Sequence, residues 1–271
     1  MSFSVTAPRG EPTPVVVEVP HAGLEVDPLA LASLVASARS LGADADLYVD
    51  QLYADAPDEG AALLVARTSR YVCDLNRAET DVDPLAVDGG KARSSPHGLV
   101  WRTTTEGRPA LASPISAREY ERRLDEYHRP YHRALVDLLE ERRARHGFAI
   151  LLCAHSMPSR GRDGHDDAGI ERADIVPGTR GRSTAASALI DRVDRLCEEF
   201  GLRVRHDEPY RGGFSTAHYG RPHEGIHAIQ IELARRLYMD ERTLAQRPAE
   251  FARLRDFCRR LVASLAAYRP A

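Results

Sequence analysis

The sequence predicts an α/β fold, because strand and helix signals alternate along its 271 residues. Three short runs rich in valine, isoleucine or leucine have the pattern of buried strands. Each run leads directly into a residue that can bind a metal ion or transfer a proton. The runs are residues 14–21, ending in His21, residues 148–155, ending in His155, and residues 226–232, ending in Glu232. Because sites in open α/β sheets form at the carboxyl ends of strands, these side chains are candidates for one metal-hydrolase centre.

The bulk composition predicts one globular domain over residues 1–271. Hydrophobic residues make up 43% and charged residues 28% of the chain, which is long enough to bury a substantial core. We find no internal repeat, low-complexity tract or break in composition. The formal net charge of -3 provides no basic field for nucleic acid or a membrane surface.

The location predicted for the protein is the cytoplasm. The amino-terminal residues lack a charged segment followed by an apolar one, so we expect no secretory signal. No window approaches 18 continuous apolar residues, so we expect no membrane span. The four cysteines have no C-x-x-C spacing and are expected to be buried free thiols in a reducing compartment.

After the first run, two helices and two strands are expected. In residues 29–41, leucines recur on one side of a short helix. Residues 44–56 have the pattern of a second helix, with carboxylates near its start, where they suit the helix dipole. Residues 61–66 and 71–75 have the apolar pattern of two further strands.

The next segment, residues 76–115, is rich in proline and glycine and is expected to be a loop. A loop of this length in a compact domain is usually functional or mobile. Its tryptophan, Trp101, is expected to pack down, either against a site or as an anchor for the loop.

A long helix is expected from Ser116 to about residue 146. Ser116 and Glu119 have the spacing of a capping box. Pro130 is expected to kink this helix, and Gly147 is a plausible stop. The strand that ends in His155 follows directly.

The remaining elements alternate between loop and regular structure. Residues 156–182 are expected to be a polar loop, and residues 183–200 a helix with apolar residues at helical spacing. Residues 202–205 are expected to form an edge strand. Residues 208–225 have the composition of a glycine-rich loop, and residues 248–268 that of an amphipathic helix.

Three of the candidate residues fit a catalytic zinc site, which usually has three protein ligands and one open position. His21 and His155 could provide two ligands. Asp46 or Asp50 could provide the third, since the two lie one helical turn apart on one face. The alternative for each histidine is a structural, hydrogen-bonded role at a strand end.

Glu232 has two interpretations, because a carboxylate is rarely buried without a partner. It could form a strand-end salt bridge with Arg235 or Arg236. It could instead be a general base beside the metal, with its pKa tuned by its neighbours.

A second candidate segment is Asp74-Leu75-Asn76-Arg77. Arg77 suits bidentate recognition of a carboxylate, and Asn76 adds a directional donor. The alternative is a structural ion pair between Arg77 and Asp74.

Ordered motifs covering most of the chain resemble those of the N-formylglutamate amidohydrolases, and more distantly those of aspartoacylases and zinc carboxypeptidases. The early motifs are Pro20-His21-Ala22-Gly23, Asp44-Ala45-Asp46 with Leu52-Tyr53, and Asp74-Leu75-Asn76-Arg77. The later ones are Arg129-Pro130-Tyr131-His132, Ala154-His155-Ser156, His218-Tyr219-Gly220-Arg221-Pro222, and Gln230-Ile231-Glu232-Leu233 with Tyr238-Met239-Asp240-Glu241.

The resemblance implies a phosphorylase/hydrolase-like fold, as in zinc carboxypeptidases, with three α/β/α layers and a mixed sheet. It implies a zinc-dependent hydrolase with His21, Asp46 and His155 as metal ligands, and it favours Asp46 over Asp50. Glu232 then corresponds to the general base.

The resemblance also implies which residues bind the substrate. Asn76 and Arg77 correspond to the pair that holds a substrate carboxylate, and His218 and Arg221 lie in a further family motif. The chain departs from the family pattern at Ala217, where we expect an arginine, so Arg180, Arg211 or Arg221 would have to replace it. It also departs at Leu47 and Tyr48, where we expect Trp-His.

The predicted function is hydrolysis of a small N-acyl amino acid by a cytoplasmic zinc amidohydrolase. N-formyl-L-glutamate, cleaved to formate and L-glutamate, is the leading candidate, and the resemblance implies a place in histidine degradation. One alternative is a metallohydrolase of the same fold acting on another N-acyl amino acid or a short peptide-like amide. Others are a catalytically silent binding protein and a structural or interaction module. Divalent ions other than zinc also accept these ligands.

Overall fold

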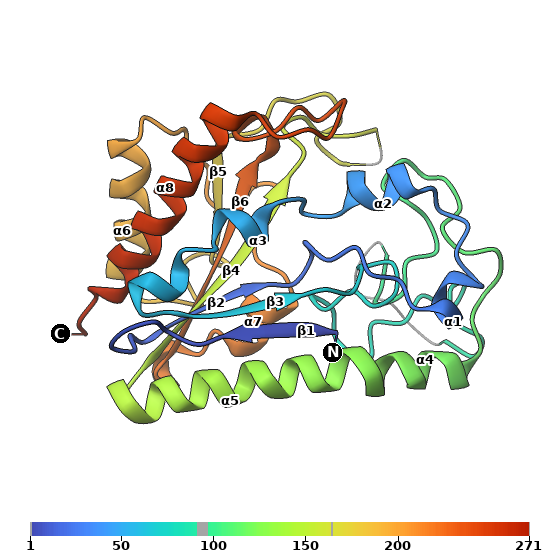
Figure 1. Ribbon diagram of the computed structural model, residues 1–271, viewed down its shortest axis with the longest axis horizontal. Coiled ribbons are helices and arrows are strands. Elements are labelled where there is room, and N and C mark those ends of the chain that lie inside the picture. The colour runs from blue at the N-terminus through green and yellow to red at the C-terminus, as the bar shows by residue number, and fades with distance from the viewer. Residues whose placement is uncertain (1, 91–96, 164, 271) are drawn as a thin grey trace.

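The computed structural model is built on a six-stranded mixed sheet, in which the strand order is β1-β3-β2-β4-β6-β5 (Figure 1). The structure describes residues 2–90, 97–163 and 165–270. The four central strands are parallel, and the edge strands β1 and β5 are antiparallel to their neighbours. The strands are β1 (Phe3–Thr6), β2 (Val15–Val19), β3 (Ala62–Ala66), β4 (Ala149–Met157), β5 (Ile175–Gly178) and β6 (Ile226–Ala234). The predicted α/β fold with a mixed sheet is thereby confirmed.

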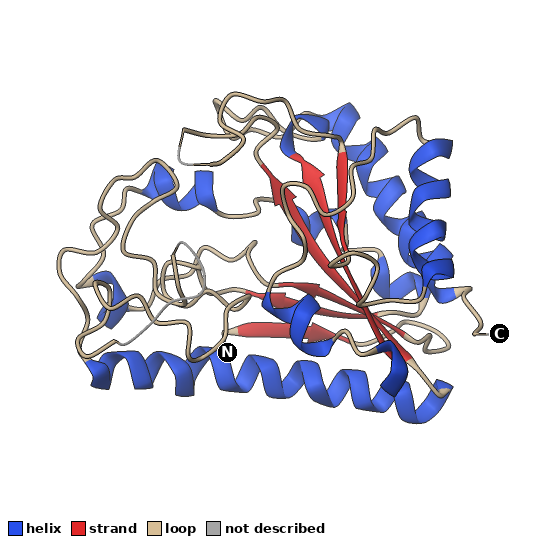
Figure 2. Ribbon diagram, turned by 180° about the vertical axis from the view of Figure 1, so that it is seen from behind, coloured by secondary structure: helices blue, strands red, loops and turns tan. Residues whose placement is uncertain are grey.

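Helices cover both faces of this sheet (Figures 1 and 2). One face carries α4 (Ala117–Arg123), α5 (Arg129–His146) and α7 (Phe214–Tyr219), and the opposite face carries α6 (Ser187–Glu199) and α8 (Pro248–Ala266). The three layers of the predicted α/β/α arrangement are therefore present. Shorter elements are α1 (Pro28–Leu31), α2 (Ala38–Asp44), α3 (Val49–Leu52) and the 3-10 turns η1 (Ala56–Glu59), η3 (Pro222–Glu224) and η4 (Arg235–Leu237).

Burial of the sheet on both faces explains why its central strands are largely apolar. Along β2, Val15, Val17 and Val19 pack in the core under α6 and α8, whereas Val16 packs in the core under α5. All nine residues of β4 and of β6 are buried. Polar residues within these strands therefore need partners inside the protein.

The helix predicted from Ser116 contains a π-helical turn, η2 (Leu124–His128), between α4 and α5. The Arg129 amide donates to the Leu124 carbonyl five residues back, and Pro130, which has no N–H, follows at once. A proline inside a helix removes a hydrogen bond and crowds the preceding turn. Where a kink is predicted at Pro130, the structure has a widened, π-helical turn just before the proline.

The predicted ends of this helix are confirmed. Ser116 caps its start by accepting a hydrogen bond from the Glu119 amide at 3.2 Å. Gly147 ends it with a φ of +82°, a conformation that favours glycine.

Two predicted strands are wrong. Residues 71–75 are buried but form turns and coil, because β1 occupies the free edge of β3 and leaves no strand to pair with. In residues 202–205 only Val204 forms a bridge, with Ile175 of the short strand β5. The helix expected at residues 44–56 is also shorter, and is reduced to α3 and η1.

Two expectations about the whole chain can be compared with the structure. All four cysteines are free and buried, as predicted. Among the described residues, none of the helices combines the length and the apolar character needed to cross a membrane.

Candidate active site

His21, Asp46 and His155 converge in the structure, although the sequence separates them widely. His21 follows β2, Asp46 lies between α2 and α3, and His155 lies near the end of β4. All three side chains are buried. The Asp46 Oδ2 atom lies 3.5 Å from His21 Nδ1 and 3.0 Å from His155 Nδ1. The strand ends therefore deliver two imidazoles to one carboxylate.

The spacing of these atoms suits a metal ion. One ligand atom from each residue lies within 4.8 Å of the others, and no other such group occurs in the described ranges. In a tetrahedral zinc site with bonds of about 2.0–2.1 Å, the donor atoms are about 3.3 Å apart. Two imidazoles and one carboxylate are also a ligand set that zinc accepts. This group could hold a divalent metal ion, whose identity the geometry does not specify.

Asp46, rather than Asp50, faces the histidines. Burial alone would raise the pKa of the Asp46 carboxyl, but hydrogen bonds from His155 and His21 hold it well below its usual value. Its Oδ1 atom lies 3.3 Å from Arg235 Nη2 and 3.5 Å from Ser156 Oγ. Asp50 is half-buried and belongs to no such group. The Asp46 carboxyl group is therefore ionised, with the two histidines at Oδ2 and with Arg235 and Ser156 at Oδ1.

Asp74 supports His21 from the other side of its ring. His21 Nε2 lies 2.7 Å from Asp74 Oδ1. In many metal sites a histidine ligand donates a hydrogen bond from its second ring nitrogen to a carboxylate, which orients the ring. The other oxygen, Oδ2, accepts hydrogen bonds from Arg70 at 2.9 Å and Trp101 at 3.0 Å.

Arg70 and Trp101 form one side of the site. The Arg70 guanidinium lies over the Trp101 ring, 4.3 Å from its centroid. Although burial raises the pKa of Asp74, the charges of His21, Arg70 and Arg77 hold it well below its usual value. Trp101 therefore packs against the site, which decides between the two roles expected for it. The roles of Asp74 and Arg70 went unpredicted, although Asp74 lies within a recognised motif.

Glu232 stands beside His155, because the two residues are partners in the parallel register of β4 and β6. Its Oε1 accepts a hydrogen bond from Gln230 Nε2 at 2.9 Å. Burial, with the nearby charge of Asp46, raises the pKa of Glu232 to about 7. A carboxyl group with this pKa can exchange a proton near neutral pH.

The salt bridge considered for Glu232 does not form. Arg235 instead donates to the Ala45 carbonyl at 2.7 Å and faces Asp46. Arg236 pairs with Asp174 at 2.5 Å. Neither Arg235 nor Arg236 therefore pairs with the Glu232 carboxyl group.

Asn76 and Arg77 lie next to the three convergent residues. Asn76 Nδ2 is 3.3 Å from His155 Nε2, and Asn76 Oδ1 accepts a hydrogen bond from the Ser215 amide at 2.9 Å. Arg77 donates to the Asn76 carbonyl at 2.9 Å, and its Nε has no partner among the described residues. The ion pair considered between Arg77 and Asp74 is absent from the described contacts, since Asp74 pairs with His21 and Arg70.

The contacts of His218 and Arg221 that the structure describes are with residues outside this group. His218 is exposed and stacks on Phe214, with ring centroids 4.8 Å apart. Arg221 pairs with Glu224 at 3.1 Å, and its backbone bridges Ile226 at the start of β6. At about 3.3 Å per residue, the six residues from the start of β6 to Glu232 span about 20 Å. The Arg221 backbone therefore lies at the opposite end of β6 from Glu232.

The other two arginines considered in place of the one expected at Ala217 lie closer to Asn76. Arg211 precedes Gly213 by two residues, and the Gly213 backbone packs against the Asn76 side chain. The Arg211 guanidinium has no partner among the described residues, whereas Arg180 donates to the Gly212 carbonyl at 3.1 Å. Arg211 is thus the one of the three whose guanidinium has no partner among the described residues.

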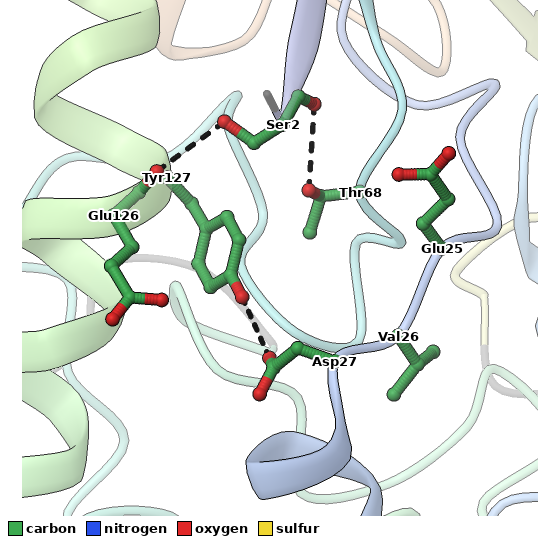
Figure 3. A pocket seen from close by; sticks show the side chains of 7 residues that line it. All are labelled: Ser2, Glu25, Val26, Asp27, Thr68, Glu126 and Tyr127. Carbon is green, nitrogen blue, oxygen red and sulfur yellow. Dashed lines mark hydrogen bonds between the residues drawn. The ribbon is translucent and has the colours of Figure 1, made fainter.

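A cavity of about 560 Å³ lies elsewhere, lined by residues that include Ser2, Asp27 and Tyr127 (Figure 3). Its polar side chains are already engaged: Tyr127 donates to Asp27 at 2.7 Å, and Ser2 donates to the Glu126 carbonyl at 3.3 Å. None of the candidate metal or substrate residues lines this cavity. It is therefore separate from the candidate active site.

Comparison with known families gives one assignment over most of the chain. The family model described as N-formylglutamate amidohydrolase matches residues 13–239. An N-formylglutamate deformylase from Pseudomonas aeruginosa is 35% identical over 259 residues, covering 94% of this chain and 93% of the relative. An N-formylglutamate deformylase from Pseudomonas putida is 36% identical over 231 residues, covering 84% and 82% of the two chains.

Solved structures agree with this assignment. The crystal structure of an N-formylglutamate amidohydrolase from Ralstonia eutropha JMP134 matches with a TM-score of 0.91 and 31% identity, covering 98% of each chain. A gene product from Agrobacterium tumefaciens matches with a TM-score of 0.71 and 21% identity, which supports the fold alone.

Proposed function

The chain belongs to the N-formylglutamate amidohydrolase family, and on this premise we propose that it is a metal-dependent enzyme that cleaves N-formyl-L-glutamate to formate and L-glutamate. The observation that carries the proposal is the convergence of His21, Asp46 and His155 beside the buried carboxyl group of Glu232. The family supports an amidohydrolase, and the names of the two deformylase relatives support this substrate.

His21, Asp46 and His155 would hold one divalent ion, with zinc as the favoured metal. A bound ion would supply Lewis acidity, which polarises a scissile carbonyl group and lowers the pKa of water. Asp74 and Arg235 would keep the ligand set in place, because they contact His21 and Asp46 respectively. The protein therefore provides both the ligands and the groups that orient them.

Glu232 would act as the general base and then as the general acid. As a carboxylate it takes a proton from the attacking water, and as a carboxylic acid it gives that proton to the leaving amine nitrogen. Its position opposite His155 and its pKa of about 7 both suit this exchange.

Arg77 and Asn76 would bind a carboxylate of the substrate and so hold the formyl group over the metal ligands. Arg77 has an unpaired Nε, and Asn76 touches His155, so both lie where such a contact would orient the substrate. Arg70 places a second half-buried cation beside Asp74 and would stabilise negative charge that develops during hydrolysis.

Formate release from N-formyl-L-glutamate, measured with the purified protein before and after chelation and after addition of zinc, tests the proposal. We expect hydrolysis that chelation abolishes and zinc restores. Hydrolysis of N-acetyl or N-aspartyl compounds in place of the formyl compound would support a related amidohydrolase. Metal binding without turnover of any of these compounds would identify a binding protein and contradict the proposal.

A further inference from the structure

Two buried histidines on the helix that contains the π turn face the Asn76–Arg77 segment. His128 is the last residue of the π turn η2, and His132 lies one turn later in α5. Their ring centroids are 4.3 Å apart, and both side chains are buried. His132 belongs to the Arg129-Pro130-Tyr131-His132 motif, to which the proposed chemistry assigns no role.

Each histidine binds a backbone carbonyl beside Asn76. His132 Nε2 lies 2.9 Å from the Leu75 carbonyl oxygen, and His128 Nε2 lies 2.8 Å from the Arg77 carbonyl oxygen. A carbonyl oxygen only accepts hydrogen bonds, so both Nε2 atoms must carry protons. The two bonds hold the peptide chain on both sides of Asn76.

Tyr219 completes this arrangement. The Tyr219 hydroxyl lies 2.9 Å from His132 Nδ1. Burial and the nearby charge of His128 lower the pKa of His132 to about 3, so its ring is neutral near pH 7. With the proton on Nε2, Nδ1 accepts the hydrogen bond that the Tyr219 hydroxyl donates.

Other backbone contacts fix the same segment. The Asn76 amide donates to Asp74 Oδ1 at 3.0 Å, and the Asp74 amide donates to the Leu99 carbonyl at 2.9 Å. The Arg77 side chain remains half-buried, with an unpaired Nε. Because the two histidines bond only to backbone carbonyl groups, they orient the segment without using a donor of the Arg77 side chain.

We propose that His132 and His128 are positioning residues that hold the Asn76–Arg77 segment in its substrate-binding conformation by donating to the Leu75 and Arg77 carbonyl groups. The π turn places His128 directly before α5, from which His132 reaches the same segment. This proposal rests on the proposed function, because it takes Asn76 and Arg77 as contacts of the substrate carboxylate.

Replacement of the His132 donor is the first test. His132→Phe keeps an aromatic ring but removes the hydrogen bond to Leu75, whereas His132→Gln keeps an N–H of similar reach. We expect His132→Phe to raise the KM for N-formyl-L-glutamate about 10- to 100-fold with a much smaller change in kcat. His132→Gln should restore most of this loss. His146→Phe, at the far end of α5, is the control and should leave KM unchanged.

Hydrogen–deuterium exchange of the metal-free protein provides a readout that does not depend on catalysis. Peptides covering residues 72–77 should exchange faster in His132→Phe than in the wild type, and His146→Phe should leave them unchanged. If the wild-type protein hydrolyses no N-acyl amino acid, the proposed function fails, and the exchange rates alone decide whether the histidines hold the segment.

Unchanged KM in a folded His132→Phe variant overturns the proposal for an active enzyme, whatever its exchange rates. If the wild-type protein is inactive, unchanged deuterium exchange of residues 72–77 in His132→Phe overturns the proposal. If His132→Phe does not fold, His128→Phe is measured in the same two assays, and unchanged values there overturn the proposal equally.

Discussion

His155 and Glu232 are direct partners in the register of the parallel strands β4 and β6. Side chains of paired residues in parallel strands project from the same face of a sheet. The register therefore sets a candidate metal ligand beside a candidate base without help from any loop. A slip of one residue would send one of the two side chains to the opposite face.

Glu232→Gln should remove most activity while retaining the metal. The amide keeps the size of the side chain and its contact with Gln230 but cannot accept a proton from water. We expect kcat to fall by about 10²- to 10⁴-fold, the usual contribution of a general base. Steady-state formate release and elemental analysis measure the two effects.

Glu224→Gln is the matched control, because it removes an exposed carboxylate just before the other end of β6. It should retain both activity and metal. A Glu232→Gln variant with wild-type turnover would remove Glu232 from the mechanism.

Glu232→Gln should also stabilise the metal-free protein at high pH. The pKa of Glu232 is about 7 in the folded protein, against 4.5 as its ordinary value. Its contribution to stability is therefore fully present below pH 4.5 and is lost as pH rises through 7. Relative to the wild type, Glu232→Gln should gain up to about 3 kcal/mol of unfolding free energy between pH 4.5 and 8.

Urea unfolding of the wild type and of Glu232→Gln at pH 4.5 and at pH 8, with chelator present, measures this difference in unfolding free energy. A difference that does not depend on pH would show that Glu232 titrates normally in the folded state. The rate experiment and this one are independent, since the second requires neither metal nor substrate.

Much of the candidate site was predictable because strand ends carry a strong sequence signal. His21, His155 and Glu232 each end a short, largely apolar run, and the central strands of a sheet buried on both faces require such runs. The long helix from Ser116 was equally clear, because it has a capping residue, helical spacing and a terminal Gly147.

The remainder depends on contacts that local sequence does not encode. Asp74 lies in a segment with the pattern of a strand, and its partners His21, Arg70 and Trp101 come from separate parts of the chain. Strand β5 has four residues and contains Pro177, so its apolar signal is too short to recognise. Arg221 lies within a family motif, but the length of β6 separates its backbone from Glu232.

Asp46 and Asp50 can be distinguished by metal binding. Of the two, Asp46 is the one grouped with both histidines. Loss of a residue that only hydrogen-bonds to a metal ligand weakens metal binding by about 10- to 100-fold. Asp46→Asn removes a proposed ligand and should therefore weaken zinc binding by more than this factor. Asp50→Asn is the matched control and should bind zinc normally. Competition with a chelating dye measures both affinities, and stronger loss in Asp50→Asn would reverse the assignment.

Arg211 is expected to recognise the side-chain carboxylate of a dicarboxylic substrate. Ala217 cannot supply this contact, Arg221 is paired with Glu224, and Arg180 is bonded to the Gly212 carbonyl. A hydrogen bond to a charged group contributes about 1.5–3 kcal/mol, or about 10- to 100-fold in kcat/KM. Arg211→Ala should therefore lower kcat/KM for N-formylglutamate by this factor and leave that for N-formylglutamine nearly unchanged.

Arg180→Ala and Arg221→Ala provide matched controls, since each removes an arginine that already has a partner. Both should preserve the ratio of kcat/KM between the two substrates. A ratio that falls in Arg180→Ala but not in Arg211→Ala would transfer the role to Arg180. If all three variants keep the ratio, carboxylate selectivity resides in Arg77 and Arg70, because these are the cations nearest to Asp74 in the candidate site.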